Sequence, residues 1–295
     1  MNYSMIEDIS ILNSYIKTKE DIKKYYEEGL FSSSQKFENF SFIKEISTAV
    51  VNINPQLKKR MSQMSLGVFY VIEEGPGKNL ANNEEIYLFS GFAEIDTTDK
   101  IIKNIVIDDM ELVSPTLFHN SVHNTPLGYY TIIKKKHNYC TTISDGLATN
   151  LSFINYIKNK VLIDEKFVVI TGEETSPFFE LDQSVKLNIV SSFISYRITP
   201  FCEKGFKFVG IFDNLEEIIN SSMFFDSKSL FVDKKYFYEL KNKTDKKIYT
   251  EYPLKQDNPS GIIFRLALPF YLDILGNSLI IEEIEGKFYL FEVKL

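Results

Sequence analysis

The chain has 295 residues, 44% of them hydrophobic, and a formal net charge of −7 at pH 7. This length suits one large domain or two small ones, and the apolar fraction can fill a sizeable core. The negative charge argues against general binding to nucleic-acid phosphates, although it leaves room for a local basic patch.

The cysteine and hydropathy patterns indicate the setting of the protein. Cys140 and Cys202 form no metal-type cluster, so we expect a reduced compartment, no metal and no cofactor. No stretch approaches the roughly 18 apolar residues of a membrane helix. The first residues also lack the basic region and apolar run of a signal peptide. We therefore expect a cytoplasmic protein that is not inserted in a membrane.

The N-terminal third predicts a strand and two helices. Residues 9–12 form an apolar strand candidate, and residues 19–28 a polar helix candidate that stops before Gly29. Asn54-Pro55 is a helix start, because Asn caps helices and Pro suits their first position. Apolar residues then recur at spacings of four, three, four and three, which predicts one buried helical stripe. They are Leu57, Met61, Met64, Val68 and Val71.

Three basic residues, Lys58, Lys59 and Arg60, follow the start of this helix. They are either a solvated helix face or a docking patch for an acidic partner. After them, residues 86–90 predict a short apolar strand that Gly91 ends, and residues 96–105 predict a helix.

Residues 114–149 are the most informative stretch: a loop, a helix, a basic turn, a strand and a second helix. His123-Asn124 stands at the head of the first helix, and we expect Gly128 to let that helix pack tightly. Residues 138–143 are rich in strand-forming side chains and end at Ser144-Asp145-Gly146. In α/β enzymes a strand that turns sharply into a helix displays a nucleophile, but here the turn carries Asp145.

The rest of the chain predicts mainly strands. Residues 166–172 are a buried strand followed by Glu173-Glu174, which we interpret as a strand-end polar contact rather than a catalytic dyad. Further elements are strands at 189–198 and 206–212, a capped helix at 214–220, a helix at 264–275 and a hairpin at 279–291. Residues 226–258 are the most polar segment and suggest a surface excursion. No repeat of fixed period is visible in the sequence.

The stretch 114–149 resembles the ketosynthase branch of the thiolase superfamily. In that family an Asn-x-Ala-Ala-Gly helix precedes a strand that ends in the catalytic cysteine, and Asn124 to Gly128 and Asn138-Tyr139 fall on those two features. The ordered pattern SPTLFHNSVHN at 114–124 is similar to short chain length factors of aryl polyene-type pathways. The resemblance implies one β-ketoacyl synthase-like domain over residues 1–295, strongest over about 40–220. It also implies an α/β, thiolase-like layered α-β-α fold that is truncated or remodelled in its second half.

The resemblance also implies that the reaction centre is vacant. Asp145 falls where the family keeps its cysteine, and an acyl adduct of aspartate would be a hydrolysis-prone anhydride. The family's two catalytic histidines come from the second half, whereas His119, His123 and His137 all precede Asp145. We interpret Cys140 and Cys202 as structural thiols.

The first hypothesis is therefore a non-catalytic chain length factor that pairs with a ketosynthase and bounds its acyl tunnel in polyketide, aryl polyene or fatty acid biosynthesis. Residues 138–144 and 123–133 would meet the partner, an acyl carrier protein would be a second partner, and Lys58, Lys59 and Arg60 would be its docking candidates. The candidate partner-facing or tunnel residues are Phe118, His123, Asn124, Tyr129, Tyr130, Asn138, Tyr139, Thr141 and Ile143. Two alternatives stay open: an acyl-thioester enzyme that uses His123 with Asp145, and a homodimer that binds an acyl carrier.

Overall fold

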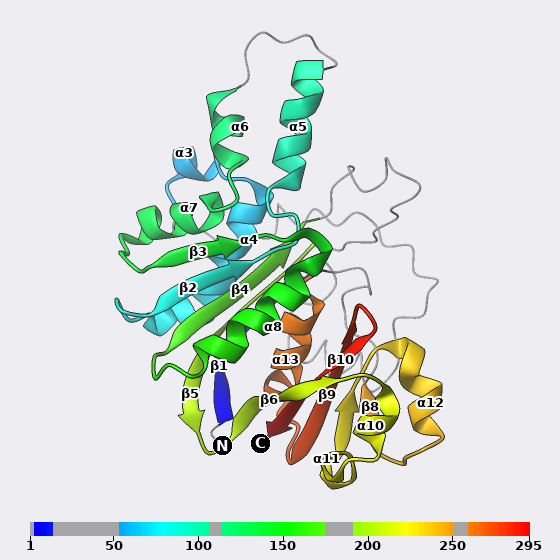
Figure 1. The fold of residues 1–295 in the computed structure, drawn as a ribbon. Helices are drawn as coiled ribbons and strands as arrows, with labels where there is room; N and C mark the ends of the chain where they lie inside the picture. Colours follow the sequence, from blue (N-terminus) through cyan, green and yellow to red (C-terminus); the bar gives the residue numbers. More distant parts are fainter. Residues whose placement is uncertain (1–2, 14–52, 107–113, 175–190, 250–258) are drawn as a thin grey trace.

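The computed structural model describes residues 3–13, 53–106, 114–174, 191–249 and 259–295 (Figure 1). The predicted helix at 19–28 lies outside these ranges. The described strands of the first half are β1 (Tyr3–Asn13), β2 (Glu85–Phe89), β3 (Cys140–Ile143), β4 (Phe167–Glu173) and β5 (Ser192–Cys202). Those of the second half are β6 (Gly205–Phe212), β7 (Ser229–Phe231), β8 (Lys247–Tyr249), β9 (Asn277–Ile284) and β10 (Lys287–Lys294).

The helices of the first half are α3 (Pro55–Lys58), α4 (Gln63–Glu74), α5 (Ile95–Val106), α6 (Pro115–Asn120), α7 (Thr125–Lys134) and α8 (Thr149–Lys160). Those of the second half are α10 (Leu215–Ile219), α11 (Ser222–Asp226), α12 (Phe237–Lys241) and α13 (Gly261–Tyr271). Short 3₁₀ helices lie at Pro76–Asn79, Gly146–Ala148 and Lys234–Tyr236.

The ten described strands run in the order β3-β2-β4-β5-β1-β6-β10-β9-β7-β8. Read from each outer edge toward the middle, the two halves have the same connectivity, because β6 to β10 occupy the places of β1 to β5. The strand directions repeat too: β2 is parallel to β3 and β4, and β7 is parallel to β8 and β9. Among the described residues, the two halves join through one strand pair, Ser4 with Phe206. The fold is thus a duplicated unit that the sequence does not reveal as a repeat.

Strand β4, in the half made of β1 to β5, is buried on both faces, and its alternate side chains enter different clusters. Phe167 and Val169 of β4 face a central cluster that both halves share, whereas Val168 and Ile170 face an outer cluster with α4 and α7. A second outer cluster covers the other face of β9 and β10 with α10 and α11. Helices therefore lie outside both sheets and also between them.

The central layer consists of α8 and α13, which contact one another (Figure 1). Most of α13 is buried, from Gly261 to Phe270, because apolar residues surround the helix instead of forming one stripe. On α8 the buried residues are spaced for one face and include Phe153, Ile154 and Ile157. This arrangement confirms the expected α/β, thiolase-like layered fold, with helices added between the two sheets. The second half keeps its five strands, although β7 and β8 are only three residues long.

Most predicted elements are confirmed, including the strand–turn–helix of β3 and α8, the cap of Asn214 on α10 and the β9–β10 hairpin. The single helix predicted from Asn54 onward is wrong. It ends as α3, and α4 begins separately because the Ser62 hydroxyl accepts a hydrogen bond from the Ser65 amide at 3.0 Å and caps a new helix.

Two other interpretations need correction. A β-carbon on Gly128 would meet nothing within 4 Å, so this glycine is not required for close packing. The surface excursion at 226–258 is wrong for β7, whose three residues are buried and pair with both β8 and β9. Within the described residues 226–249, α12 carries polar side chains, while the short runs of β7 and β8 extend the sheet.

Candidate functional site

The carboxyl ends of β2, β3 and β4 meet at the turn that carries Asp145. Gly91, directly after Ser90 at the end of β2, is hydrogen-bonded to the turn after β3 and to Glu173 at the end of β4. The Gly91 carbonyl accepts hydrogen bonds from the Gly146 amide and the Ser144 hydroxyl, both at 3.0 Å. A β-carbon on Gly91 would lie 2.2 Å from Cγ of Pro259, so only glycine fits. The turn that carries Asp145 is therefore held by the turn after β2.

Glu173, at the end of β4, is buried below this junction. Its carboxyl oxygens accept hydrogen bonds from the amides of Gly91 and Phe92 and from the hydroxyls of Ser90 and Ser260. Burial raises the pKa of Glu173 to about 7, and these hydrogen bonds oppose that shift. The contacts are those of the predicted strand-end polar group.

Two more buried carboxyl groups lie nearby. Glu94 accepts hydrogen bonds from the hydroxyls of Ser62 at 2.5 Å, Thr97 at 3.0 Å and Ser65 at 3.1 Å. Burial raises the pKa of Glu94 to about 7 and raises the pKa of Glu174 well above its usual range. Glu94 ties the start of α4 to the start of α5, so these acids brace the loops around the strand ends.

Asp145 and His123 are both exposed. Asp145 accepts a hydrogen bond from the Ser152 hydroxyl at 2.6 Å, and its own amide donates to Thr149 Oγ1 at 3.3 Å. Within the described ranges, no hydrogen bond or ion pair joins Asp145 to His123. Asn124 precedes α7 without a side-chain capping bond. An acid–base pair of His123 and Asp145 stays a prediction that no contact favours.

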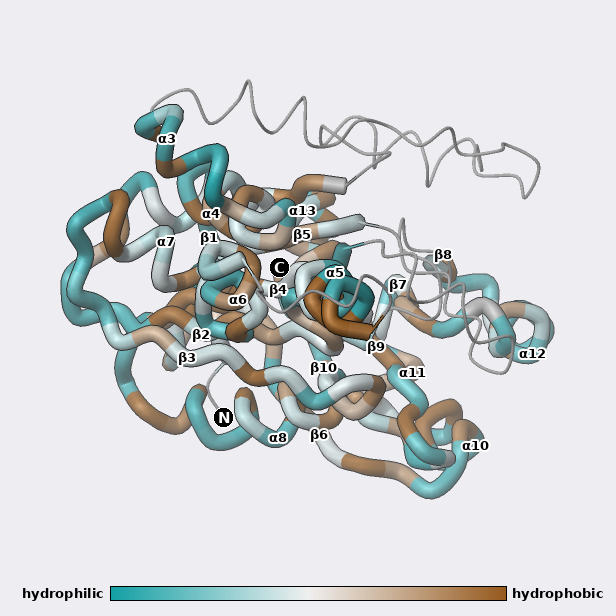
Figure 2. The backbone as a smooth tube through the Cα atoms, turned by 90° about the horizontal axis from the view of Figure 1, so that it is seen from above, coloured by the Kyte–Doolittle hydropathy of each residue, from teal (hydrophilic) through white to brown (hydrophobic). Residues whose placement is uncertain are grey.

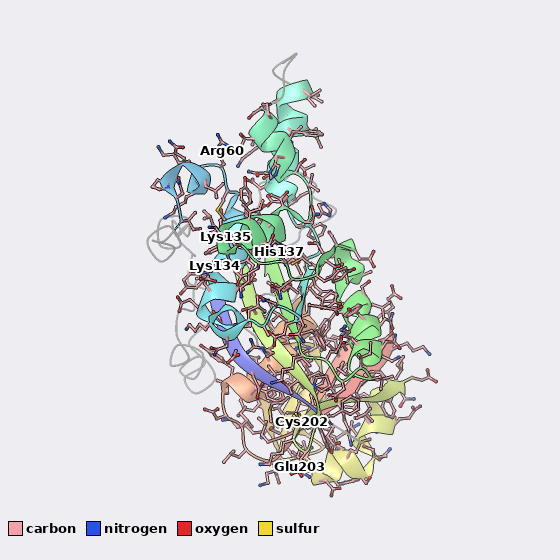
Figure 3. The ribbon with its side chains drawn as sticks, turned by 90° about the vertical axis from the view of Figure 1, so that its left-hand side faces the viewer. Arg60, Lys134, Lys135, His137, Cys202 and Glu203 are labelled. Carbon is pink, nitrogen blue, oxygen red and sulfur yellow. The ribbon has the colours of Figure 1, made fainter. Side chains whose placement is uncertain are left out.

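Among the described residues, no hydrogen bond joins either thiol to a histidine, and Cys140 and Cys202 are both free cysteines. Cys140 is half-buried on β3, its Sγ lies 3.4 Å from the Asn138 carbonyl, and burial raises its pKa to about 11. At neutral pH it is a protonated thiol and a poor nucleophile. Cys202 lies near Glu203 at the other end of the molecule from His137 (Figure 3).

The edge of the first sheet is a second candidate site. Strand β3 pairs with β2 on one side and is the outermost strand in the sheet order. Tyr139, directly before it, is 62% exposed, and Phe118 on α6 is 67% exposed. Thr141 and Ile143 are half-buried. Further exposed apolar side chains on this side are Val122, Ile132 and Leu147. The edge strand and its apolar border have the composition of an interface.

Helices α5 and α6 project beyond the body of the molecule next to this edge (Figure 1). Ile102, Ile105 and Val106 on the outer end of α5 are each more than half exposed. Figure 2, which looks down on α5, shows brown hydrophobic stretches at that end. Exposed apolar side chains are therefore found on α5 as well as on α6 and α7, and α5 contacts α6.

Three of the predicted partner or tunnel residues pack inside the chain instead. Tyr130 is fully buried against Phe69, with ring centroids 5.6 Å apart. The Tyr129 hydroxyl donates to Asn120 Oδ1 at 3.0 Å and to the Arg60 carbonyl at 3.2 Å. The Asn138 amide donates to the carbonyls of Ala81 and Glu84, both at 2.7 Å. These side chains hold α6, α7 and the entry to β3 in place.

The basic residues border the same surface. Lys59 and Arg60 are exposed and Lys58 is partly buried. The Arg60 carbonyl is bonded to Asn120 as well as Tyr129, which fixes the α3–α4 turn against α6 and α7. Arg60 lies on the same side as Lys134, Lys135 and His137 of the α7–β3 turn (Figure 3).

The roles of Ser90, Glu94 and Ser260, and the hydrogen bonds of Gly91, were not predicted from the sequence. A glycine directly after a buried strand, and the Ser62-x-x-Ser65 spacing before a helix, were the available local signals. Apart from Thr97, which is three residues from Glu94, the partners of Glu173 and Glu94 are 29 to 87 residues away in sequence, so pattern alone does not pair them. Among the described residues, no group of three or more His, Cys, Asp and Glu side chains is placed to hold a metal ion. No helix in those ranges is long and apolar enough to cross a membrane.

The strand order and the layers define a duplicated, layered α/β protein. Residues 34–152 match the family model described as β-ketoacyl synthase, N-terminal domain, which confirms the resemblance over that segment. No curated protein sequence matches the chain.

Solved structures show the same fold across the whole chain. One is a ketosynthase (ApeO) in complex with its chain length factor (ApeC) from Xenorhabdus doucetiae, with 11% identity, a TM-score of 0.62 and 99% of both chains covered. The ishigamide ketosynthase/chain length factor has 11% identity, a TM-score of 0.63 and the same coverage. A type II acyl-carrier protein complex with its ketosynthase, AntDE:AntF, has 11% identity and a TM-score of 0.65, covering 100% of this chain and 99% of that one.

Proposed function

We propose that this protein is a non-catalytic chain length factor that pairs with a ketosynthase in type II polyketide-type chain assembly. The observation that carries the proposal is the turn after β3, where Asp145 is exposed and bonded to Ser152. A condensing enzyme needs a thiolate and two imidazoles there, and the chain has no histidine after His137. Two of the similar structures are described as containing a chain length factor, which supports this choice among ketosynthase-like roles.

The partner surface we propose is β3 with α6 and α7. An exposed strand edge can extend its sheet into a second chain, and the apolar side chains around it would be buried on pairing. Phe118, Tyr139 and Ile132 are the exposed aromatic and aliphatic groups that would contribute most. Phe118 and Tyr139 are therefore the better candidates for a tunnel wall, since Tyr129 and Tyr130 already fill the core of this chain.

An acyl carrier protein would be the second partner, as in the complex with AntDE. We place its docking site at Lys59 and Arg60, with Lys58 at its edge. Long-range attraction between basic side chains and an acidic carrier would mainly raise the association rate. Reversing both charges in Lys59→Glu/Arg60→Glu should slow association at low salt, while the same changes at Lys241 and Lys294, on the other half, should not.

The main test is co-expression with a ketosynthase of a type II chain-assembly system. Native mass spectrometry should show a one-to-one complex, and an acyl-thioester condensation assay should show product only when both proteins are present. Condensation by this protein alone would refute the proposal. A persistent homodimer in the presence of the ketosynthase would favour a separate carrier-binding role.

A further inference from the structure

The Glu173 carboxyl group sits in a set of donors that converge from three parts of the chain. The amides of Gly91 and Phe92 and the hydroxyl of Ser90 belong to the turn after β2, and the Ser260 hydroxyl precedes α13. Ser90 Oγ lies 3.2 Å and Ser260 Oγ 2.7 Å from the carboxyl oxygens. We call these four donors the Glu173 cradle.

The cradle is specific for an acceptor group. A main-chain N–H cannot reverse its direction, so two of the four donors demand oxygen atoms whatever the hydroxyls do. Each Glu173 oxygen faces one amide and one hydroxyl: Oε1 faces Gly91 and Ser260, and Oε2 faces Phe92 and Ser90. A planar group with two equivalent oxygens matches this arrangement.

Glu94 provides a contrast inside the same structure. Its three donors are hydroxyls, which can rotate, and the Ser62 hydroxyl already has a second partner in Ser65 Oγ at 2.8 Å. Removing Glu94 would let those hydroxyls bond to one another. Removing Glu173 would take the carboxyl acceptor away from the buried Gly91 amide and the partly buried Phe92 amide, a cost that polar groups in an interior avoid.

We propose that the Glu173 cradle is a carboxylate-binding site that the protein fills with its own side chain. The occupied cradle links the first half to α13 of the second half and, through the Gly91 carbonyl, to the turn that carries Asp145. It also closes these donors to the carbonyl or carboxylate of any outside acyl group. This inference does not depend on the chain length factor role, because it concerns donors and an acceptor within one chain.

The experiment empties the cradle and offers it a small carboxylate. Glu173→Ala removes the carboxyl group, and thermal unfolding is followed at pH 8 in sodium formate and in sodium chloride of equal ionic strength. Binding of formate to the folded variant should raise its Tm saturably, by about 2–4 °C at concentrations ten to a hundred times Kd. Wild type, whose cradle is occupied, and Glu94→Ala should show no difference between the two salts.

A second variant, Glu173→Gln, provides a test of the cradle if Glu173→Ala folds poorly. Glu173→Gln keeps the cradle filled but turns a side-chain N–H₂ toward one fixed amide, so it should have a lower Tm than wild type and no formate response. If Glu173→Ala is insoluble, its refolding yield in formate against chloride is measured instead, and formate should raise it. A formate response equal in Glu173→Ala, Glu94→Ala and wild type would overturn the proposal, as would a Glu173→Gln protein as stable as wild type.

Discussion

The hydrogen-bond pattern of β3 allows its two edges to be tested separately with proline. In a parallel ladder, alternate residues direct both main-chain groups to the same neighbouring strand. The carbonyls of Tyr139 and Ile143 accept from the amides of Ile86 and Ser90, at 2.9 and 3.1 Å. Thr141 lies midway and pairs with β2, so Thr142 directs its amide to the outer edge.

Thr142→Pro should therefore block pairing with a partner strand and leave the chain's own sheet intact. A partner carbonyl left buried without its donor costs about 1–3 kcal/mol, which weakens binding roughly 5- to 150-fold. Thr141→Pro should instead destabilise the chain's own sheet, because it removes a ladder hydrogen bond to β2. We expect it to lower Tm by about 2–5 °C. Stability is measured by circular dichroism, and binding to a co-expressed ketosynthase by native mass spectrometry and titration.

Binding by Thr142→Pro tests whether β3 is the pairing edge, and its stability relative to Thr141→Pro tests the direction of the main-chain amides. A Thr142→Pro protein that binds its partner as tightly as wild type would show that β3 is not the pairing edge. A Thr142→Pro protein as unstable as Thr141→Pro would instead contradict the assigned direction of the amides. The Thr142 hydroxyl makes no hydrogen bond in the structure, so its loss adds no polar penalty of its own.

Three further predictions concern the packing that supports these sites. Arg197 is buried between Glu84, Asp8 and the carbonyls of Pro76 and Asn79. In denaturant unfolding, Arg197→Met should lower the unfolding free energy by about 3–5 kcal/mol, and Arg197→Lys should lower it less. Gly67→Ala would bring a β-carbon within 2.5–2.7 Å of the Phe193 ring and should cost about 1–3 kcal/mol, a loss that the added change Phe193→Leu should reduce. The pKa of Glu94 is raised from 4.5 to about 7, so its protonation stabilises the folded state below pH 4.5, and this contribution is lost as pH rises through about 7. The unfolding free energy of Glu94→Gln should accordingly fall less between pH 5 and 8; an unchanged pH slope would contradict the assignment.

Local patterns in the sequence were sufficient for most of the first half. The strand, turn and helix around Asp145 could be predicted because β-rich residues, a Gly and an apolar helical spacing follow one another within a short segment. The break at Ser62 was missed because the apolar spacing continues through it, while the cap depends on a single hydroxyl. Gly128 was misjudged because a glycine in a helix has no signal that separates close packing from open space.

Long-range features were beyond pattern reading. The repeat of strand order is invisible because β7 and β8 are three residues each and share no spacing with β2 and β3. Glu173 was correctly interpreted as a strand-end group, but Ser260 could not be assigned to it because it lies 87 residues further along the chain. The burial of Tyr129 and Tyr130 was likewise decided by α4 packing on α7, a contact between distant segments.

The central helix layer has a consequence for how the molecule comes apart. The described halves share one strand contact, Ser4 with Phe206, yet both contribute to the same apolar cluster around α13. Separating them would remove the apolar cover that β1 and α8 of the first half give to α13, so we expect the two halves to unfold together. Calorimetry should then record one heat-absorption peak whose van't Hoff and calorimetric enthalpies agree, despite the duplicated architecture.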